Sequence, residues 1–276
     1  MMQNSIEMES TIKESVFLSF FHFLGKRTIS ATNNLGGILI FFTLAFLKIF
    51  RRKQIREIIQ QIYYIGAKSS SIVMLVGLFT GMVLGLQLFY ALYKFGSQGV
   101  LGSLVAFTLI RELGPVLTAI TITARAGSAM TAEIGILRIS EQIDALYTMR
   151  IDPQRYLISP RIAASIISFP LLTAFFDLIG ILGGYLTGVV LLGVDKGAYL
   201  SRIYTYVELV DVRGGFIKSL VFAVLVSTIC CYEGYFTHLR IDSYGAKSVS
   251  LSTTSAVVFS CVTILISDYI VTSFLM

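Results

Sequence analysis

Five long apolar stretches constrain this chain more than any other feature, because each is long enough to cross a membrane. A helix needs roughly 20 apolar residues to cross the hydrocarbon core of a bilayer. The stretches cover residues 71–93, 100–124, 162–192, 216–236 and 249–276. Hydrophobic residues make up 55% of the chain and charged residues 14%, whereas soluble domains are roughly a quarter charged. We therefore predict an all-α polytopic membrane protein with about five transmembrane helices.

A shorter apolar run precedes these stretches. It covers residues 36–50 and is followed directly by three basic residues, Arg51, Arg52 and Lys53. An apolar run of this length flanked by cations is typical of an amphipathic helix that lies in the membrane interface. Residues 1–35 lack the order of charged, apolar and cleavage-site regions that defines a signal peptide. We expect a poorly defined N-terminal segment at 1–35 and one membrane domain at 36–276.

The distribution of Lys and Arg predicts the orientation of the spans. Six basic residues lie between residues 48 and 68, just before the first stretch, and the segment 126–161, with Arg125 just before it, is also rich in arginine. In contrast, the segment after the first stretch offers only Lys94. Cytoplasmic loops carry an excess of Lys and Arg. We therefore expect the N-terminus and the segment 126–161 on the cytoplasmic side, or its stromal equivalent.

Charged residues interrupt the second stretch in the sequence RELGP. At about 1.5 Å per residue, Arg111 lies roughly 16 Å from Val100, near the middle of the span. Adjacent residues on a helix point about 100° apart, so Arg111 and Glu112 cannot pair with each other. Each needs another partner, and the acidic candidates in later spans are Asp177, Glu233 and Asp268. Pro115 lacks a backbone donor, and we expect its ring to bend the helix beside these charges.

Glycines recur every four residues in two of the stretches. The two series are Gly77, Gly81 and Gly85, and Gly180, Gly184 and Gly188. Small residues at this spacing form a groove in which another helix backbone approaches closely. The groove serves either packing within one subunit or a dimer seam or sliding surface, and the spacing alone does not decide.

Segment 126–161 contains an amphipathic pattern. Its apolar residues recur at helical spacing, at Ile136, Ile139, Ile143, Leu146 and Met149. The pattern predicts a short helix that ends near Asp152, because a following proline disfavours helical backbone. This helix is either a plain connector or a docking helix for a cytoplasmic partner.

Several chemistries find no support in the chain. It has no G-x-x-x-x-G-K-[ST] loop to cradle a nucleotide phosphate. Its three Cys and two His show no metal-ligand spacing. We predict no metal, no cofactor and no nucleic-acid partner. An intramembrane enzyme using buried carboxylates such as Glu112 and Asp177 lacks any supporting catalytic motif.

Several motifs, in order, carry a resemblance to a known family. They are GMVLGLQ at 81–87, RELGPVLTAITITARAGSAMTAEIG at 111–135, EQIDAL, DPQRYLISPR and IKSLVFA at 217–223. From about Lys48 to the C-terminus the chain resembles the MlaE family of ABC-transporter permeases. The resemblance implies a homodimer that moves phospholipid or a related lipid between membranes. It also implies a separate ATPase subunit that uses the ATP, a substrate-binding protein of the MCE type and, in some systems, a STAS-domain protein.

The resemblance gives roles to the residues above. The segment 126–161 would hold the coupling helix that meets the ATPase, with candidates Glu141, Asp144, Arg150, Asp152 and Arg155. The substrate-path candidates are Arg111, Glu112, Pro115, Asp177 and Asp268. Arg111 either grips a phospholipid phosphate with two hydrogen bonds or joins Glu112 and Asp268 in a network that only holds helices together.

Two further alternatives concern function and location. The substrate could be another hydrophobic molecule such as a sterol, or the chain could be a membrane scaffold that anchors an ATPase without transporting. The Ile-, Phe- and Ser-rich composition and the stretch IDALYTMRIDPQRYLI resemble cyanobacterial or plastid members of the family. We expect a bacterial inner membrane or the plastid inner envelope, with a plastid-encoded chain in the second case because no transit peptide is recognisable.

Overall fold

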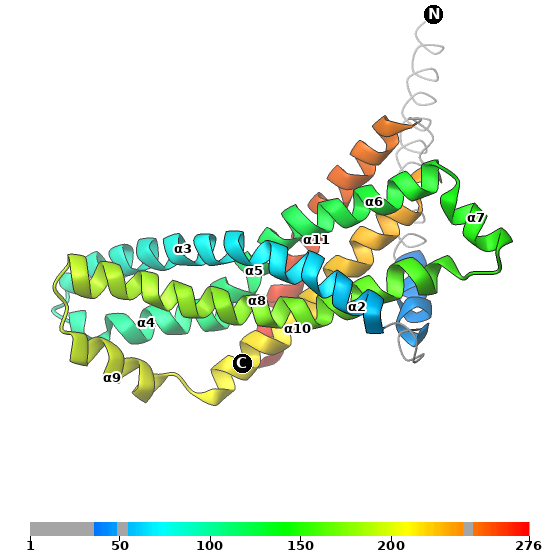
Figure 1. Ribbon diagram of the computed structural model, residues 1–276. Helices are drawn as coiled ribbons and strands as arrows, with labels where there is room; N and C mark the ends of the chain where they lie inside the picture. The colour runs from blue at the N-terminus through cyan, green and yellow to red at the C-terminus, as the bar shows by residue number, and fades with distance from the viewer. Residues whose placement is uncertain (1–35, 49–54, 240–244, 276) are drawn as a thin grey trace, which may run out of the picture. The chain divides into compact units, whose positions relative to one another are not determined.

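The computed structural model describes residues 36–48, 55–239 and 245–275 (Figure 1). The chain divides into two units, residues 1–44 and 45–276. Within the described parts, all regular structure is helical, and five helices are long and apolar enough to cross a membrane. A shorter apolar helix, Gly36–Lys48, precedes them. The predicted fold class is therefore confirmed, including the short helix in front of the five spans.

The first three spans are composite helices with short π-helical turns inside them. Span 1 consists of α2 (Ile55–Ile62), η1 (Tyr63–Ala67) and α3 (Lys68–Tyr93). Span 2 consists of η2 (Gln98–Val100), α4 (Leu101–Thr108), η3 (Leu109–Leu113), α5 (Gly114–Ile122), η4 (Thr123–Gly127) and α6 (Ser128–Ile139). Span 3 consists of η5 (Gln154–Ile158), α8 (Ser159–Tyr185) and η6 (Leu186–Leu191).

The last two spans are uninterrupted α-helices, α10 (Leu209–Tyr235) and α11 (Ala246–Leu275). Three short helices connect the spans: α7 (Gln142–Thr148), α9 (Lys196–Tyr206) and η7 (Thr237–Leu239). Helix α10 packs against α5, α6, α8 and α11, and α8 packs against α2, α3, α4, α5 and α10. Helix α9 packs against α4 and runs back alongside it (Figure 1).

The helices extend beyond the apolar stretches from which they were predicted. Span 2 was expected to end at residue 124 but continues to Ile139, and span 1 begins at Ile55 rather than residue 71. Polar residues are accommodated in these helices because their hydroxyls find acceptors on the preceding turn, as when Ser128 Oγ donates to the Ala124 carbonyl. The expected loop at 126–161 is consequently helical over much of its length.

The amphipathic helix predicted from Ile136 to Met149 is wrong as one continuous element. Helix α6 ends at Ile139, and Glu141 adopts a left-handed backbone with φ of 58° before α7 begins. Because this turn breaks the helical repeat, the apolar residues do not share one face. Ile143 is fully buried, whereas Ile136 is 57% and Met149 67% exposed.

The two glycine series pack against each other between α3 and α8. A Cβ atom at Gly81 would overlap the carbonyl of Gly180, and one at Gly85 would lie 3.2 Å from Gly184 Cα. A Cβ at Gly77 would lie 2.9 Å from the Phe176 carbonyl. We call this contact the glycine seam. Most of both series therefore serves packing within one chain, while Gly188 packs instead on the side chain of Leu101.

Two arginines of the basic segments tie the helices together at the end that carries α7. Arg125 donates from Nη1 to the Tyr64 carbonyl at 3.0 Å and to Ser69 Oγ at 2.9 Å. Arg161 is buried, and its Nη2 lies 2.8 Å from Glu133 Oε2. These side chains therefore contribute structure as well as positive charge.

Candidate functional site

The RELGP stretch forms a π-helical turn that opens its backbone toward α10. Arg111 and Glu112 lie in η3, just before Pro115. Since proline has no N–H, the Arg111 carbonyl four residues earlier loses its usual helical donor. Lys218 Nζ in α10 replaces that donor and bonds the Arg111 carbonyl at 2.9 Å. Helix α10 can approach this closely because Gly215 has no Cβ. A Cβ there would lie only 2.5 Å from the Ile110 carbonyl.

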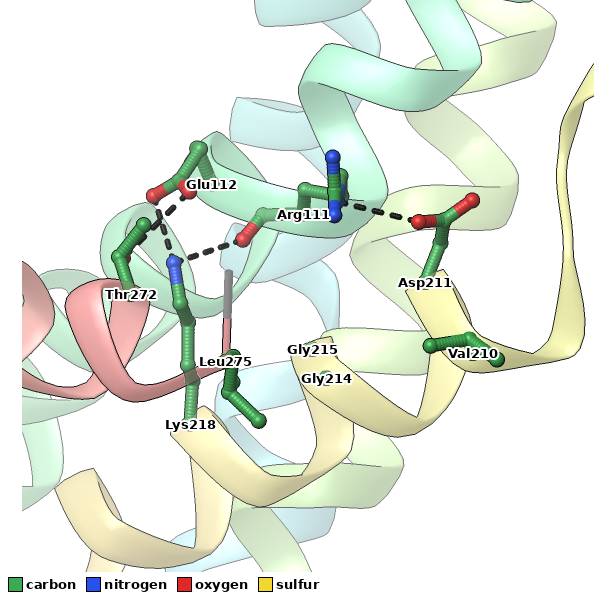
Figure 2. Close-up of a pocket in the computed structure, with 9 residues that line it drawn as sticks. All are labelled: Arg111, Glu112, Val210, Asp211, Gly214, Gly215, Lys218, Thr272 and Leu275. Atoms are coloured by element: carbon green, nitrogen blue, oxygen red, sulfur yellow. Dashed lines mark hydrogen bonds and ion pairs between the residues drawn. The ribbon is translucent and has the colours of Figure 1, made fainter.

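The side chains of Arg111 and Glu112 pair in different directions. Lys218 Nζ lies 2.6 Å from Glu112 Oε2 and 3.1 Å from Asp268 Oδ1 in α11. Arg111 Nε lies 3.1 Å from Asp211 Oδ1, near the start of α10. Figure 2 shows Arg111 and Glu112 diverging from η3 toward these separate partners. We call these five ionisable residues the ion cluster.

Two members of the ion cluster were not predicted. Asp211 is the partner of Arg111, in place of Asp177, Glu233 or Asp268. Asp211 precedes the apolar stretch at 216–236, so a search confined to apolar runs passes over it. Lys218 was missed although it lies within that stretch, where a lone lysine is itself a signal. The expected link between Glu112 and Asp268 exists, but it runs through Lys218.

The remaining substrate-path candidates lie beside the cluster without joining it. Asp177 in α8 points at Gly114, where an added Cβ would overlap Asp177 Oδ1. This oxygen has no hydrogen-bond partner within the described parts of the chain. Pro115 is buried and does not line the pocket at the cluster. Its missing N–H leaves the Arg111 carbonyl to Lys218, and a bend of the helix at Pro115 stays a prediction.

A small pocket opens at the ion cluster. Its volume is about 40 Å³, and it is lined by Arg111, Glu112, Val210, Asp211, Gly214, Gly215, Lys218, Thr272 and Leu275 (Figure 2). A buried water needs about 10–15 Å³, so the pocket has room for a few waters or one small polar group. A whole phospholipid does not fit within it.

The ion cluster is unbalanced in charge. Two cations, Arg111 and Lys218, face three carboxylates, Glu112, Asp211 and Asp268. The Lys218 side chain is only 3% exposed, whereas that of Arg111 is 29% exposed and reaches the pocket. Arg111 is therefore the cation of the cluster that is accessible to a ligand.

The predicted coupling residues divide into two groups around α7. Asp144 Oδ1 accepts from Arg138 Nη1 at 2.7 Å, and Glu141 is exposed at the left-handed turn before α7. On the other side of α7, Asp152 Oδ2 lies 2.5 Å from Lys48 Nζ. Arg150 is exposed with φ of 59°, and Arg155 is half-buried in η5. The structure thus does not gather the five residues into one site.

Five long apolar helices and a charged site between them define an integral membrane protein built around an intramembrane polar site. Sequence comparison identifies the class as the permease subunit of an ABC transporter. A probable ABC transporter permease protein of Rickettsia prowazekii is 39% identical over 258 residues, which cover 93% of this chain and 98% of that protein.

The family follows from the same comparison. The family model described as Permease MlaE matches residues 58–274, and the chain belongs to this family. The intermembrane phospholipid transport system permease protein MlaE of Haemophilus influenzae is 40% identical over 94% of this chain and 98% of its own length. The chloroplastic protein TRIGALACTOSYLDIACYLGLYCEROL 1 of Arabidopsis thaliana is 35% identical over 79% of this chain and 61% of its own length.

Proposed function

We propose that this permease moves phospholipid, or a related lipid, between membranes and that a separate ATPase subunit drives it. The exposure of Arg111 within the ion cluster carries the proposal. The Nε of Arg111 pairs with Asp211. The remaining N–H groups of a guanidinium can bind a phosphate through two parallel hydrogen bonds. The name of the Haemophilus relative supports phospholipid as the substrate class.

A second copy of the chain would complete the lipid path. One chain offers a pocket of about 40 Å³ at the cluster, which is smaller than a lipid headgroup with its chains. A homodimer would enclose a larger space between two such sites. A substrate-binding protein of the MCE type would deliver or receive the lipid, and a STAS-domain protein would bind the ATPase in some systems.

The ATPase would dock where α7 and the segment after it expose apolar side chains. Met149, Ile151 and Tyr156 are all exposed there. The sequence has no Walker loop, so ATP hydrolysis falls to the partner. A scaffold that only anchors the ATPase would not require five ionisable groups inside the spans, since buried charge is costly.

Reconstitution tests the proposed transport. The permease, its ATPase and the MCE-type protein are placed in vesicles of phosphatidylethanolamine and phosphatidylglycerol, and transfer of headgroup-labelled lipid is followed with ATP. We expect transfer that needs ATP, falls in Arg111→Ala and is partly retained in Arg111→Lys. Mass spectrometry of lipid that copurifies separates phospholipid from sterol. A sterol alone, or equal transfer without ATP, contradicts the proposal.

Orientation is tested by labelling single cysteines in intact cells or organelles. Ser97 is exposed between spans 1 and 2, and Gln142 is exposed at the start of α7. With the N-terminus and α7 on the cytoplasmic or stromal side, Ser97→Cys reacts with an impermeant thiol reagent and Gln142→Cys does not. The chain with its three native cysteines replaced is the control. The reverse labelling pattern would overturn the orientation, whether the host membrane is bacterial or the plastid inner envelope.

A further inference from the structure

Helix α10 connects the ion cluster to the region of α7. Asp211 and Lys218 lie in its first half, and Tyr235 is its last residue. At 1.5 Å per residue, the distance from Asp211 to Tyr235 along the helix is about 36 Å. Unlike the first three spans, α10 contains no π-helical turn. A continuous α-helix packed on four others transmits displacement from one end to the other with little internal bending.

Arg138 joins three elements at the far end of α10. This residue lies in the last turn of α6, and its Nη1 donates to Asp144 Oδ1 in α7 at 2.7 Å. Its Nε donates to His238 Nδ1 in η7 at 2.9 Å. Its guanidinium also lies 5.7 Å from the centre of the Tyr235 ring. One side chain thus connects α6 to three other elements, which are α7, η7 and the end of α10.

A second contact fastens α7 to α10 directly. The hydroxyl groups of Tyr147 in α7 and Tyr235 in α10 lie 2.7 Å apart. Helix α7 has only seven residues, and left-handed backbone at Glu141 and Arg150 lies on either side of it. A helix this short has little stability of its own. Its position therefore depends on its tertiary contacts, which are the buried Ile143 and the polar contacts of Arg138 and Tyr147.

We propose that Arg138 and the Tyr147–Tyr235 pair are positioning residues that fasten α7 to α10, so that movement of α7 displaces Asp211 and Lys218 in the ion cluster. The proposal rests on the proposed function, since the ATPase supplies the movement. It assigns α10 as the element that carries the motion across the membrane. It also separates the residues that transmit motion from the exposed apolar residues that dock the ATPase.

His238 makes this fastening sensitive to pH. Its Nδ1 accepts a hydrogen bond, which requires an unprotonated nitrogen. Partial burial first, and the nearby Arg138 second, lower the pKa of His238 below its usual 6.5, while Asp144 and a backbone bond to Tyr235 oppose this. Glu141 lines the same hollow. The lowered pKa means that the folded state favours neutral His238, so the fastening holds at neutral pH and weakens as the pH falls below the usual value.

The experiment measures lipid moved per ATP hydrolysed in the reconstituted complex. The variants are Tyr235→Phe, Tyr147→Phe, their double mutant and Arg138→Lys, with Tyr204→Phe, an exposed tyrosine of α9, as the matched control. Losing one hydrogen bond should lower the ratio by about two- to tenfold. The double mutant should be no worse than either single mutant, because both remove the same contact. ATPase capture and basal hydrolysis should stay near the parent values.

A pH series adds a measurement that a merely structural role would not change. The parent ratio should hold at neutral pH and fall as the pH drops below about 6.5, whereas His238→Gln, which keeps an acceptor but does not titrate, should not show this fall. An unchanged ratio in Tyr235→Phe and Arg138→Lys overturns the inference, even if thermal stability drops. Lost ATPase capture also overturns it, because the contacts would then serve docking. If the parent complex moves no lipid with ATP, the proposed function fails first and the inference with it.

Discussion

The glycine seam and the ion cluster solve the same problem, holding helices together inside a membrane, by opposite means. In the seam, α3 and α8 approach until backbone meets backbone, and no polar side chain is needed. In the cluster, η3, α10 and α11 meet through five ionisable side chains. Helix packing in lipid uses both small residues and polar contacts. The comparison teaches that the seam is built to stay closed, whereas the cluster keeps charge where a ligand can reach it.

Removing Lys218 should produce the largest effect. Lys218→Met leaves Glu112, Asp268 and the Arg111 carbonyl without their shared cation. Breaking a buried ion pair by removing one partner costs about 3–5 kcal/mol. We expect a large drop in yield and thermal stability in detergent, with Lys196→Met, an exposed lysine of α9, as the control. Near-normal stability would show that the cluster does not hold the helices.

A methyl group in the glycine seam should have the next largest effect. In Gly81→Ala the new Cβ overlaps the Gly180 carbonyl, and backbone cannot rotate away. Overpacking typically costs about 1–3 kcal/mol. The control is Gly99→Ala, where an added Cβ meets no atom within 4 Å. Equal melting temperatures for the two variants would contradict close packing of α3 on α8.

Arg111→Ala should lower thermal stability less than Lys218→Met does, and it should reduce the amount of retained phospholipid more. Arg111→Ala removes the partner of Asp211, but the Asp211 side chain still accepts from the Glu208 backbone at the start of α10. We expect a coupling energy of about 0.5–3 kcal/mol between Arg111→Ala and Asp211→Asn in thermal unfolding. Coupling of Arg111 to Asp268 should be weaker, because no contact joins their side chains directly. Retained phospholipid, measured by mass spectrometry, should fall in Arg111→Ala. If Arg111 couples more strongly to Asp268 than to Asp211, the assignment of Asp211 as its partner is wrong.

Thr272 should contribute least to the cluster. Its hydroxyl lies 3.5 Å from Glu112 Oε1 but only 2.8 Å from the Asp268 carbonyl in its own helix. The first contact is long for a hydrogen bond, so Thr272→Val should change stability by less than about 0.5 kcal/mol. Thr254→Val, where the hydroxyl bonds only within α11, is the comparison. If Thr272→Val lost as much stability as Arg111→Ala does, Thr272 would belong to the residues that position Glu112.

The sequence predicted much of the fold because the membrane makes local composition decisive. The number of spans and the short helix before them follow from apolar length alone. The ends of the helices did not follow, since helix α6 continues through polar residues until the left-handed turn at Glu141 stops it. A search for apolar runs identifies where a helix can lie in lipid. It does not identify where the backbone hydrogen bonding of that helix ends.

By itself, the sequence determined that Arg111 and Glu112 lie inside a span, that they cannot pair with each other, and that glycines line one face of each of two helices. Adjacent positions and four-residue spacings are properties of a single helix. Only the tertiary structure decided that Asp211 meets Arg111, that Lys218 joins Glu112 to Asp268 and that the glycine series meet each other. Each of these depends on which faces of separate helices are brought together, and that choice is made by packing over the whole membrane domain rather than by any local run of residues.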